Sequence, residues 1–339
     1  MKKRLARHAL TSLAAAGVPL SRDRLQILAP ERAPETTVAQ IARQVGAARA
    51  FATFGVRTAA NAKPTLELRD PKGDAIGFVK LAWNPVTAEA VENEATAMTT
   101  MGGSSRSAIL APRVLADGLV DGRRFVMTEP LPRGIRHVPA TYSSLRPSEA
   151  LGPGAVQRWA PIGDSGQVQL VLQGLRTTTS TTPPALSERA YKLAARVAAA
   201  STKVPIANFW HGDFVWWNTG RDPRGQLWLF DWETAQADAP AGMDSLHWYT
   251  HTADAENPDS VVTRVEAALA HTQPLLRSLG HSAASTSILA AWYAVTLVAN
   301  EVRLAEALGD WERVKHSPAL LEQILAWGSA QLSEGSSLR

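Results

Sequence analysis

The chain has 339 residues, of which 45% are apolar and 19% are charged. This length exceeds one ordinary domain and suits a large bilobed unit or two domains, and the composition excludes an intrinsically disordered protein. A net charge of +4 without a basic stripe argues against nucleic-acid binding, and the lack of cysteine excludes disulfides and cysteine-ligated metal and fits a cytoplasmic protein.

Residues 1–45 predict an N-terminal helical extension. The opening "MKKRLARHALTSLAAAGVPLS" imitates a secretory signal, but Thr11 and Ser12 interrupt its apolar part, so we interpret it as an ordinary helix. A second helix is predicted over "TTVAQIARQVGAARAFA", where Val38 and Ile41 stand at helical spacing. No stretch approaches the roughly 20 apolar residues that a membrane span needs, so we expect no membrane partner.

Residues 46–130 predict a small lobe built on a sheet. The segments "PTLELRD" and "AIGFVKLAW" alternate around the turn "PKGD", which indicates a β-hairpin with Lys80 near the end of its second strand. A helix follows over "NPVTAEAVENEATAMTTM", and it ends at Gly102 and Gly103. The segment "APRVLADGLVDGRRFVMTEPLP" contains two more strands. With "RAFATFGVR" as the first strand, these elements make a five-stranded antiparallel sheet that carries one helix.

Residues 131–339 predict a larger, mainly helical lobe. Within it, residues 139–187 are rich in Ser, Thr, Pro and Gly, and their pattern predicts no element. Helices run from "SERAYKLAARVAAAS" onward, and Trp292, Trp311 and Trp327 stand at helical positions typical of core residues. The exception is "WHGDFVWWNTGR", which leads through the turn "RDPRG" to the predicted strand "QLWLFDW".

The segment "WHGDFVWWNTGR" and the strand after it carry several oxygen-bearing side chains. Asp213 and Asn218 stand five positions apart in one loop, and the hairpin after them returns with Asp231. Hard oxygen ligands suit Mg²⁺. One Asp that accepts the proton of an attacking hydroxyl, with an Asn and a second Asp that hold metal, is a phosphoryl-transfer arrangement. The aromatic neighbours are expected to fix the loop and to exclude water: Phe214, Trp216, Trp217, Trp228, Phe230 and Trp232.

The motifs "HGDFVWWN" and "FDWE" resemble those of the aminoglycoside phosphotransferase and choline kinase-like family, in a functionally unassigned branch. The resemblance covers about residues 40–250 and implies an α+β fold of the bilobed protein-kinase-like kind. It also implies that Asp213 is the catalytic base and that Asn218 and Asp231 bind Mg²⁺. The phosphoryl donor would be ATP or another nucleoside triphosphate.

The resemblance further implies a lysine that meets the α- and β-phosphates, and Lys80 stands in that place. Three glutamates of the next helix compete to orient it. At 100° per residue, Glu94 falls on the packed face of that helix, Glu92 on its flank and Glu89 on the far side. A buried carboxylate needs a partner, so we predict that Glu94 pairs with Lys80. The alternative is a solvated acidic helix beside a snorkelling lysine.

The segment "FVMTEPLP" is expected, by the same resemblance, to join the lobes and to hold adenine. Thr128 takes the gatekeeper place, and the Glu129 carbonyl and the Leu131 N–H would bind the base. Pro130 falls between them, where a missing N–H does no harm. One departure is "FGVRTAANAKP", which stands at the place of the phosphate-covering loop with a single glycine, so polar side chains or backbone N–H groups of that segment would substitute.

Other polar residues have plainer interpretations. Asp244 is expected to be an N-cap or a structural support rather than a catalytic group. His247 and His251 have the spacing of a helical metal pair, but no third ligand follows, so we disfavour zinc and expect His251 at the solvent. Gly212 stands where protein kinases usually have Arg, and residues 232–242 are short for an activation loop, which disfavours a protein substrate.

We therefore predict ATP- and Mg²⁺-dependent phosphorylation of a hydroxyl group on a small molecule such as an aminoglycoside-like antibiotic, a sugar or an amino alcohol. The alternative is a pseudokinase-like protein that binds nucleotide without turnover. No oligomeric state is predicted. A polycationic acceptor would need a cluster of carboxylates, for which the candidates are Asp238, Asp244, Asp254, Glu256 and Asp259.

Overall fold

The structure is a computed structural model that describes residues 35–47, 50–55, 63–102, 108–256 and 260–337. The helix expected at the start of the chain and the expected phosphate-covering segment 56–62 lie outside these residues. Residues 38–339 form one compact unit, distinct from residues 1–37. The division into an extension (1–45), a small lobe (46–130) and a large lobe (131–339) stays a prediction.

A five-stranded antiparallel sheet forms the N-terminal part, as predicted, with the strand order β1-β2-β3-β6-β5. Between β5 and β6 the chain turns at Asp121 (φ 50°) and Gly122 (φ 72°), a two-residue hairpin turn whose twist matches that of the flanking strands. The strands are β1 (Phe51–Gly55), β2 (Thr65–Arg69), β3 (Ala75–Leu81), β5 (Val114–Val120) and β6 (Arg123–Thr128).

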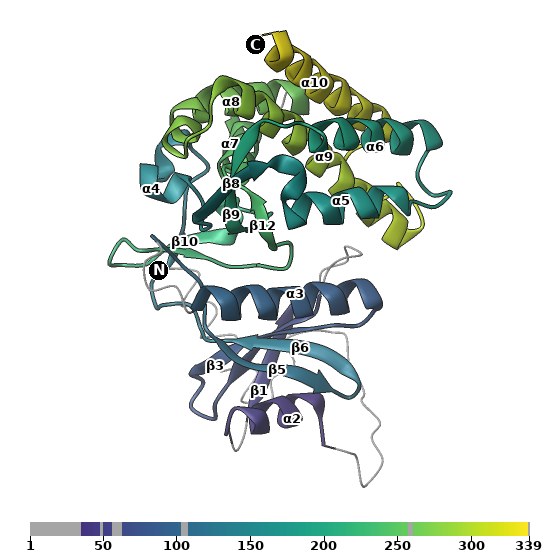
Figure 1. Cartoon of the computed structure of the whole chain (residues 1–339). Helices are drawn as coiled ribbons and strands as arrows, with labels where there is room; N and C mark the ends of the chain where they lie inside the picture. The colour runs from purple at the N-terminus through teal and green to yellow at the C-terminus, as the bar shows by residue number, and fades with distance from the viewer. Residues whose placement is uncertain (1–34, 48–49, 56–62, 103–107, 257–259, 338–339) are drawn as a thin grey trace. The chain divides into compact units, whose positions relative to one another are not determined.

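Two helices cover opposite faces of this sheet (Figure 1). Because side chains alternate along a strand, Phe125 and Met127 of β6 pack in one cluster with Ile41 of α2 (Thr37–Gln44). Val126, between them, packs in another cluster with Val91 of α3 (Pro85–Gly102). The second cluster continues into the C-terminal part of the chain, so α3 has packing partners on both sides.

The C-terminal part is mainly helical, which with the antiparallel N-terminal sheet confirms the predicted α+β class. Its largest core cluster lies among α5, α6, α9 and α10. The two tryptophans predicted for the core at 292 and 327 are buried there, and Trp311 packs against the same cluster. The helices are α5 (Gly166–Arg176), α6 (Pro184–Ala198), α7 (Met243–Glu256), α8 (Val261–Ser278), α9 (Ala283–Leu308) and α10 (Pro318–Ser337).

Helix α9 corrects the expectation that no stretch of the chain is apolar enough to span a membrane. It is long and apolar enough, by length and composition, to cross a membrane, with a mean hydropathy of 1.3 over its most apolar stretch. In the fold, 67% of that stretch is buried among the other helices. A helix that is apolar on every side is also what the centre of a helical core requires.

Residues 139–187, for which the sequence predicted no element, contribute short helices and one strand. That strand, β8 (Val156–Pro161), pairs with β9 (Lys203–Trp210), which pairs in turn with β12 (Gln236–Pro240). The partners of β8 lie more than 40 residues away, so its formation depends on pairing rather than on local pattern. The remaining elements of the region are η1 (Tyr142–Ser144), α4 (Pro147–Ala150), η2 (Ile162–Asp164), the helix α5 and the first turn of α6.

A four-stranded sheet of order β4-β11-β10-β7 supports the loop that follows β9. The predicted strand "QLWLFDW" is strand only at its centre, because the chain leaves the extended conformation at Asp231 (φ 71°). The strands are β4 (Ile109–Leu110), β7 (Arg136–His137), β10 (Thr219–Arg221) and β11 (Leu227–Leu229), and the turn η3 (Trp216–Asn218) precedes β10.

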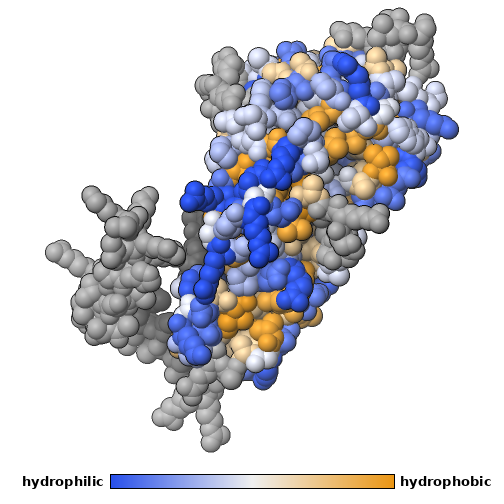
Figure 2. Space-filling model, turned by 90° about the vertical axis from the view of Figure 1, so that its left-hand side faces the viewer, coloured by the Kyte–Doolittle hydropathy of each residue, from blue (hydrophilic) through white to orange (hydrophobic). Residues whose placement is uncertain are grey.

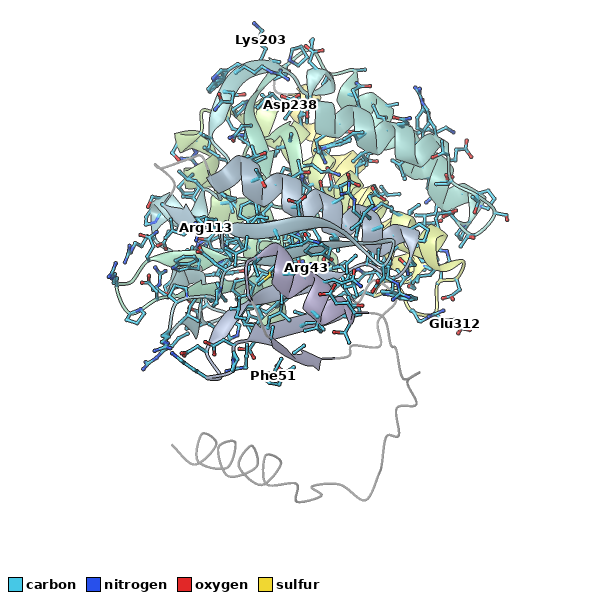
Figure 3. The ribbon with its side chains drawn as sticks, turned by 90° about the horizontal axis from the view of Figure 1, so that it is seen from below. Arg43, Phe51, Arg113, Lys203, Asp238 and Glu312 are labelled. Atoms are coloured by element: carbon cyan, nitrogen blue, oxygen red, sulfur yellow. The ribbon has the colours of Figure 1, made fainter. Side chains whose placement is uncertain are left out.

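Large apolar side chains also reach the surface at scattered places. Phe51 on the edge strand β1 is one of them and points away from the ribbon (Figure 3). On the face drawn in Figure 2, hydrophilic residues (blue) lie between hydrophobic ones (orange). Such scattered exposure is ordinary for a folded protein.

A buried ion pair fixes the four-stranded sheet to residues 139–187. Arg221 of β10 donates through Nη1 to Glu149 Oε1 (2.8 Å) and through Nη2 to Glu149 Oε2 (2.9 Å). Arg221 also donates to the carbonyl oxygens of Ser144 (3.1 Å) and Gly225 (2.9 Å). Burial alone would raise the pKa of Glu149, which is 1% exposed, but the bonds from Arg221 and Arg146 hold that pKa below its usual value.

We expect Arg221→Met to lower the free energy of unfolding by about 2–3 kcal/mol, because it removes two charged hydrogen bonds from a buried carboxylate that keeps only its contacts with Arg146. Equilibrium denaturation in urea measures this, with Arg224→Met in the exposed turn as the control. The double variant with Glu149→Met should recover much of the loss. Equal stability of Arg221→Met and Arg224→Met would contradict the interpretation.

Candidate functional site

A cleft of about 680 Å³ lies where the N-terminal sheet, α3 and the loops after β9 and β11 meet. Carboxylates, lysines and an amide line one end of it, and Phe78, Leu131 and Met98 are among its apolar lining. The eight residues that the sequence predicted for the site all line this cleft: Lys80, Glu94, Thr128, Glu129, Leu131, Asp213, Asn218 and Asp231.

Lys80 stands at the centre of the charged end. Its Nζ lies 2.6 Å from Glu94 Oε1 and donates a second bond to Asp231 Oδ1. Glu94 is 3% exposed, whereas Glu92 pairs with Arg124 near the surface and Glu89 is exposed. The helical phase therefore selects Glu94 among the three glutamates, because it alone lies on the face of α3 that is buried at Lys80.

Burial and neighbouring charges shift the pKa values of these groups in opposite directions. Burial favours neutral Lys80, but the carboxylates of Glu94 and Asp231 hold its pKa above the usual value. Burial raises the pKa of Glu94. For Asp231, the nearby ammonium of Lys80 outweighs burial and lowers the pKa to about 2. Asp231 is thus a carboxylate at neutral pH.

The loop after β9 presents Asp213 beside Asn218. Asn218 Nδ2 donates to Asp213 Oδ2 (2.7 Å) and to the Asp213 carbonyl (3.1 Å), and these bonds hold the carboxylate in place. The backbone N–H of Phe230 donates to the Asn218 carbonyl (3.1 Å), which ties the returning hairpin to the loop. Residues 213, 218 and 231 are therefore brought together by short local contacts.

Aromatic side chains fill the space behind this loop. Phe214 and Trp232 are fully buried, and Trp232 contacts the ring of His211 edge to face (4.5 Å between centroids). Burial lowers the pKa of His211 to about 4, so its neutral ring accepts the Asp213 N–H through Nδ1 (3.2 Å). Trp217 differs from the expectation of a packing role, because it is 39% exposed and lines the cleft.

Asp244 supports the loop from α7. Its carboxylate accepts the N–H groups of His211 (3.0 Å) and Gly212 (3.3 Å), and the residue is 4% exposed. Gly212 has φ 82°, and a Cβ there would lie 2.6 Å from the Thr234 carbonyl oxygen, so the turn requires glycine. Asp244 therefore has the structural role expected from the sequence, through the loop backbone rather than as an N-cap.

The contact between His247 and Asp213 was not predicted from the sequence. His247 Nε2 lies 3.5 Å from Asp213 Oδ1, and its Nδ1 lies 3.2 Å from the hydroxyl of buried Tyr293. His251 packs against the rings of His247 and Trp217 instead of facing solvent, and burial holds its pKa well below the usual value. The spacing of the two histidines was the available signal, but it pointed to metal rather than to Asp213.

Lys63 and Glu233 also line the charged end and were not predicted. They form an ion pair with each other. Burial and the neighbouring carboxylate of Asp231 raise the pKa of Glu233 to about 7. Glu233 is the last residue of the motif "FDWE", so the sequence could have indicated that it lies at the site. Lys63 precedes a proline in a segment without a recognisable motif, and only the fold places it.

Asp244 generates a pH-dependent prediction. Burial raises its pKa to about 6, so protonation favours the folded state, and its contribution to the unfolding free energy falls as pH rises from about 4 to about 6. The Asp244→Asn variant has no titrating group at this position. Between about pH 4 and pH 6 its free energy of unfolding should therefore fall by less than that of the wild type, and the two falls should differ by up to roughly 3 kcal/mol. Denaturation at several pH values tests this, with exposed Asp164→Asn as the control. Identical pH profiles for Asp244→Asn and the wild type would refute it.

Comparisons with known proteins give limited information. No family model matches the chain, and no curated protein matches it. Among solved structures, spectinomycin phosphotransferase APH(9)-Ia, crystallised with ADP and spectinomycin, is similar over 83% of this chain and 93% of its own, with 10% identity and a TM-score of 0.39. A likeness of this degree transfers no residue role and no activity, so the functional assignment rests on the geometry of the cleft.

Proposed function

We propose that the protein is a phosphotransferase that moves the terminal phosphoryl group of ATP, or of another nucleoside triphosphate, to a hydroxyl group of a small molecule. The observation that carries this proposal is the convergence at Lys80. Its ammonium bonds to a helix carboxylate, Glu94, and to a loop carboxylate, Asp231, within one cleft that also contains Asp213 and Asn218. Positioning and charge stabilisation are what phosphoryl transfer requires of a protein.

The far end of the cleft suits a planar base. Thr128, Glu129 and Leu131 line it, and the Glu129 side chain is turned back to accept the backbone N–H of Arg113 (3.0 Å). We assign the Glu129 carbonyl and the Leu131 N–H to adenine. Pro130, between them, has no N–H to leave unsatisfied.

The charged end suits the phosphates and a divalent cation. Asp231 and Asn218 supply a carboxylate and an amide oxygen, the donor set that Mg²⁺ prefers. The Asn218 amide bonds to Asp213 through its nitrogen, which leaves its oxygen outside that bond. We therefore assign Asn218 and Asp231 to Mg²⁺, which when bound would neutralise phosphate charge. Lys80, oriented by Glu94, would meet the α- and β-phosphates.

Asp213 is the proposed base. The acceptor hydroxyl oxygen forms a bond to the γ-phosphorus as the bond from that phosphorus to the β,γ-bridging oxygen breaks. The electron pair of the broken bond stays with the bridging oxygen of the departing nucleoside diphosphate, ADP in the case of ATP, and the hydroxyl proton passes to the carboxylate of Asp213. Asn218 Nδ2, 2.7 Å from Oδ2, keeps that carboxylate in one orientation.

The acceptor belongs to the class of small hydroxylated molecules such as sugars, amino alcohols and aminoglycoside-like antibiotics. Of the candidate carboxylates for a polycation, Asp238 pairs with Arg158 (2.7 Å), and Asp244 is buried under the loop. Figure 3 shows Asp238 well apart from Arg113, which contacts Glu129. These two carboxylates therefore offer no polycation site. We propose that the reaction takes place in the cytoplasm, where a donor such as ATP is available.

The pseudokinase-like alternative predicts loss of at least one key group. Lys80, Asp213, Asn218 and Asp231 are all present, and all line one cleft. The complete set supports turnover over nucleotide binding alone.

The direct test is Asp213→Asn in an assay of acceptor-dependent ADP release, with Mg²⁺, ATP and a panel of hydroxylated acceptors. We expect turnover to fall about a hundred- to ten-thousandfold, the usual contribution of a positioned base, while nucleotide affinity is kept. Asp164→Asn, at an exposed carboxylate, is the matched control. Acceptor-dependent turnover that survives Asp213→Asn would exclude Asp213 as the base.

His247 is expected to position Asp213, because its ring lies 3.5 Å from Oδ1. His247→Ala should lower kcat about ten- to hundredfold through misplacement of the carboxylate, with nucleotide affinity unchanged. His247→Gln should recover part of the loss. The control is His271→Ala, whose ring packs on Tyr142 and Tyr249 elsewhere. An equal effect of both alanine variants on kcat would rule out the positioning role.

A further inference from the structure

The charged end of the cleft contains a second buried lysine. Lys63 is 9% exposed, lines the same cleft as Lys80 and forms an ion pair with Glu233. The neighbouring carboxylates crowd together, since oxygens of Glu94, Asp231 and Glu233 all lie within 4.8 Å of one another. Three carboxylates therefore face two ammonium groups, and each ammonium bonds to at least one of them.

The strand register explains why the two lysines share a face. Thr65 of β2 pairs directly with Lys80 of β3, and the Leu81 N–H donates to the Pro64 carbonyl (3.2 Å), which extends the pairing toward Lys63. Side chains two residues apart on a strand point the same way, and so do directly paired residues. Lys63, Thr65 and Lys80 accordingly all line the cleft.

Stability alone is a weak reason for such a pair. A buried ion pair often contributes no more to folding than apolar residues of the same size would. Lys63 and Glu233 lie at the wall of a cleft, where an incoming anion could take the place of the carboxylate. Lys63 also directly follows the segment that lacks the expected glycine-rich motif, at the place where a kinase needs contacts to phosphate.

We propose that Lys63 is a second phosphate-binding lysine, which leaves Glu233 and bonds to the terminal phosphates when a nucleoside triphosphate enters the cleft. This inference rests on the proposed phosphotransferase function. A triphosphate offers several charged acceptor oxygens, and bonds between ammonium and phosphate are among the stronger hydrogen bonds of proteins. Lys63 in this way supplies contacts that a glycine-rich backbone would otherwise provide.

The test is calorimetric binding of a non-hydrolysable ATP analogue, ADP and adenosine to the full chain, with Mg²⁺. Lys63→Met should weaken binding of the ATP analogue about ten- to hundredfold, the loss expected for a charged hydrogen bond. ADP should lose less, and adenosine nothing. Lys63→Arg should keep most of the affinity. Lys72→Met, at an exposed lysine of the turn between β2 and β3, is the matched control and should match the wild type.

A double variant separates phosphate binding from a structural role. Lys63→Met leaves Glu233 unpaired, so Lys63→Met with Glu233→Gln removes that unpaired charge as well. Weak binding of the ATP analogue by the double variant supports the inference, whereas recovery to wild-type affinity overturns it. Equal losses for adenosine and the ATP analogue also overturn it. If the wild-type protein binds no nucleotide, the proposed phosphotransferase function itself is overturned. If the wild type binds nucleotide and Lys63→Met binds it equally well, only the role of Lys63 is overturned.

Discussion

The ammonium group of Lys80 is the point at which the separate parts of the cleft are held to one another. Strand β3 carries it, helix α3 brings Glu94, and the loop after β11 brings Asp231. A buried charge without partners is costly, so the sheet, the helix and the loop must meet in one arrangement. Asn93 adds to this, since its Nδ2 donates to the carbonyls of Glu233 (2.8 Å) and Ala235 (2.7 Å) across the same contact.

The loop that carries Asp213 is fixed differently, through its backbone. Asp244 binds two consecutive N–H groups, Gly212 supplies a conformation that other residues adopt with strain, and Thr234 donates to the His211 carbonyl (3.0 Å). None of these three contacts involves the side chain of Asp213. The carboxylate of Asp213, the proposed base, can thus stay in the open cleft while the peptide that bears it is held by buried groups, which is the arrangement that precise positioning needs.

Much of this was accessible from the sequence, for identifiable reasons. The alternation around Lys80, the turn "PKGD" and the helical phase of Glu94 are local properties, and they predicted the N-terminal sheet and the Lys80–Glu94 pair correctly. Strand β8 and the pairs Glu149–Arg221 and Asp213–His247 join residues more than 30 positions apart, in segments without periodicity. Lys63 is the clearest case, because its place in the cleft follows from the pairing of β2 with β3 and from no motif.

The charge balance of the cleft links its stability to its proposed activity. Lys80 lies on β3 and Lys63 lies just before β2, and Asp231 and Glu233 both come from the loop after β11. The pairs between them therefore hold the two parts of the fold together while the cleft has no ligand. Under the proposed function, a nucleoside triphosphate with Mg²⁺ would bring anionic oxygens for the lysines and a cation for Asp231, so that binding would exchange partners and leave no buried charge alone. Substrate binding and contact between the sheet and the loop thus use the same side chains. A substitution at any of these four residues should affect both properties at once.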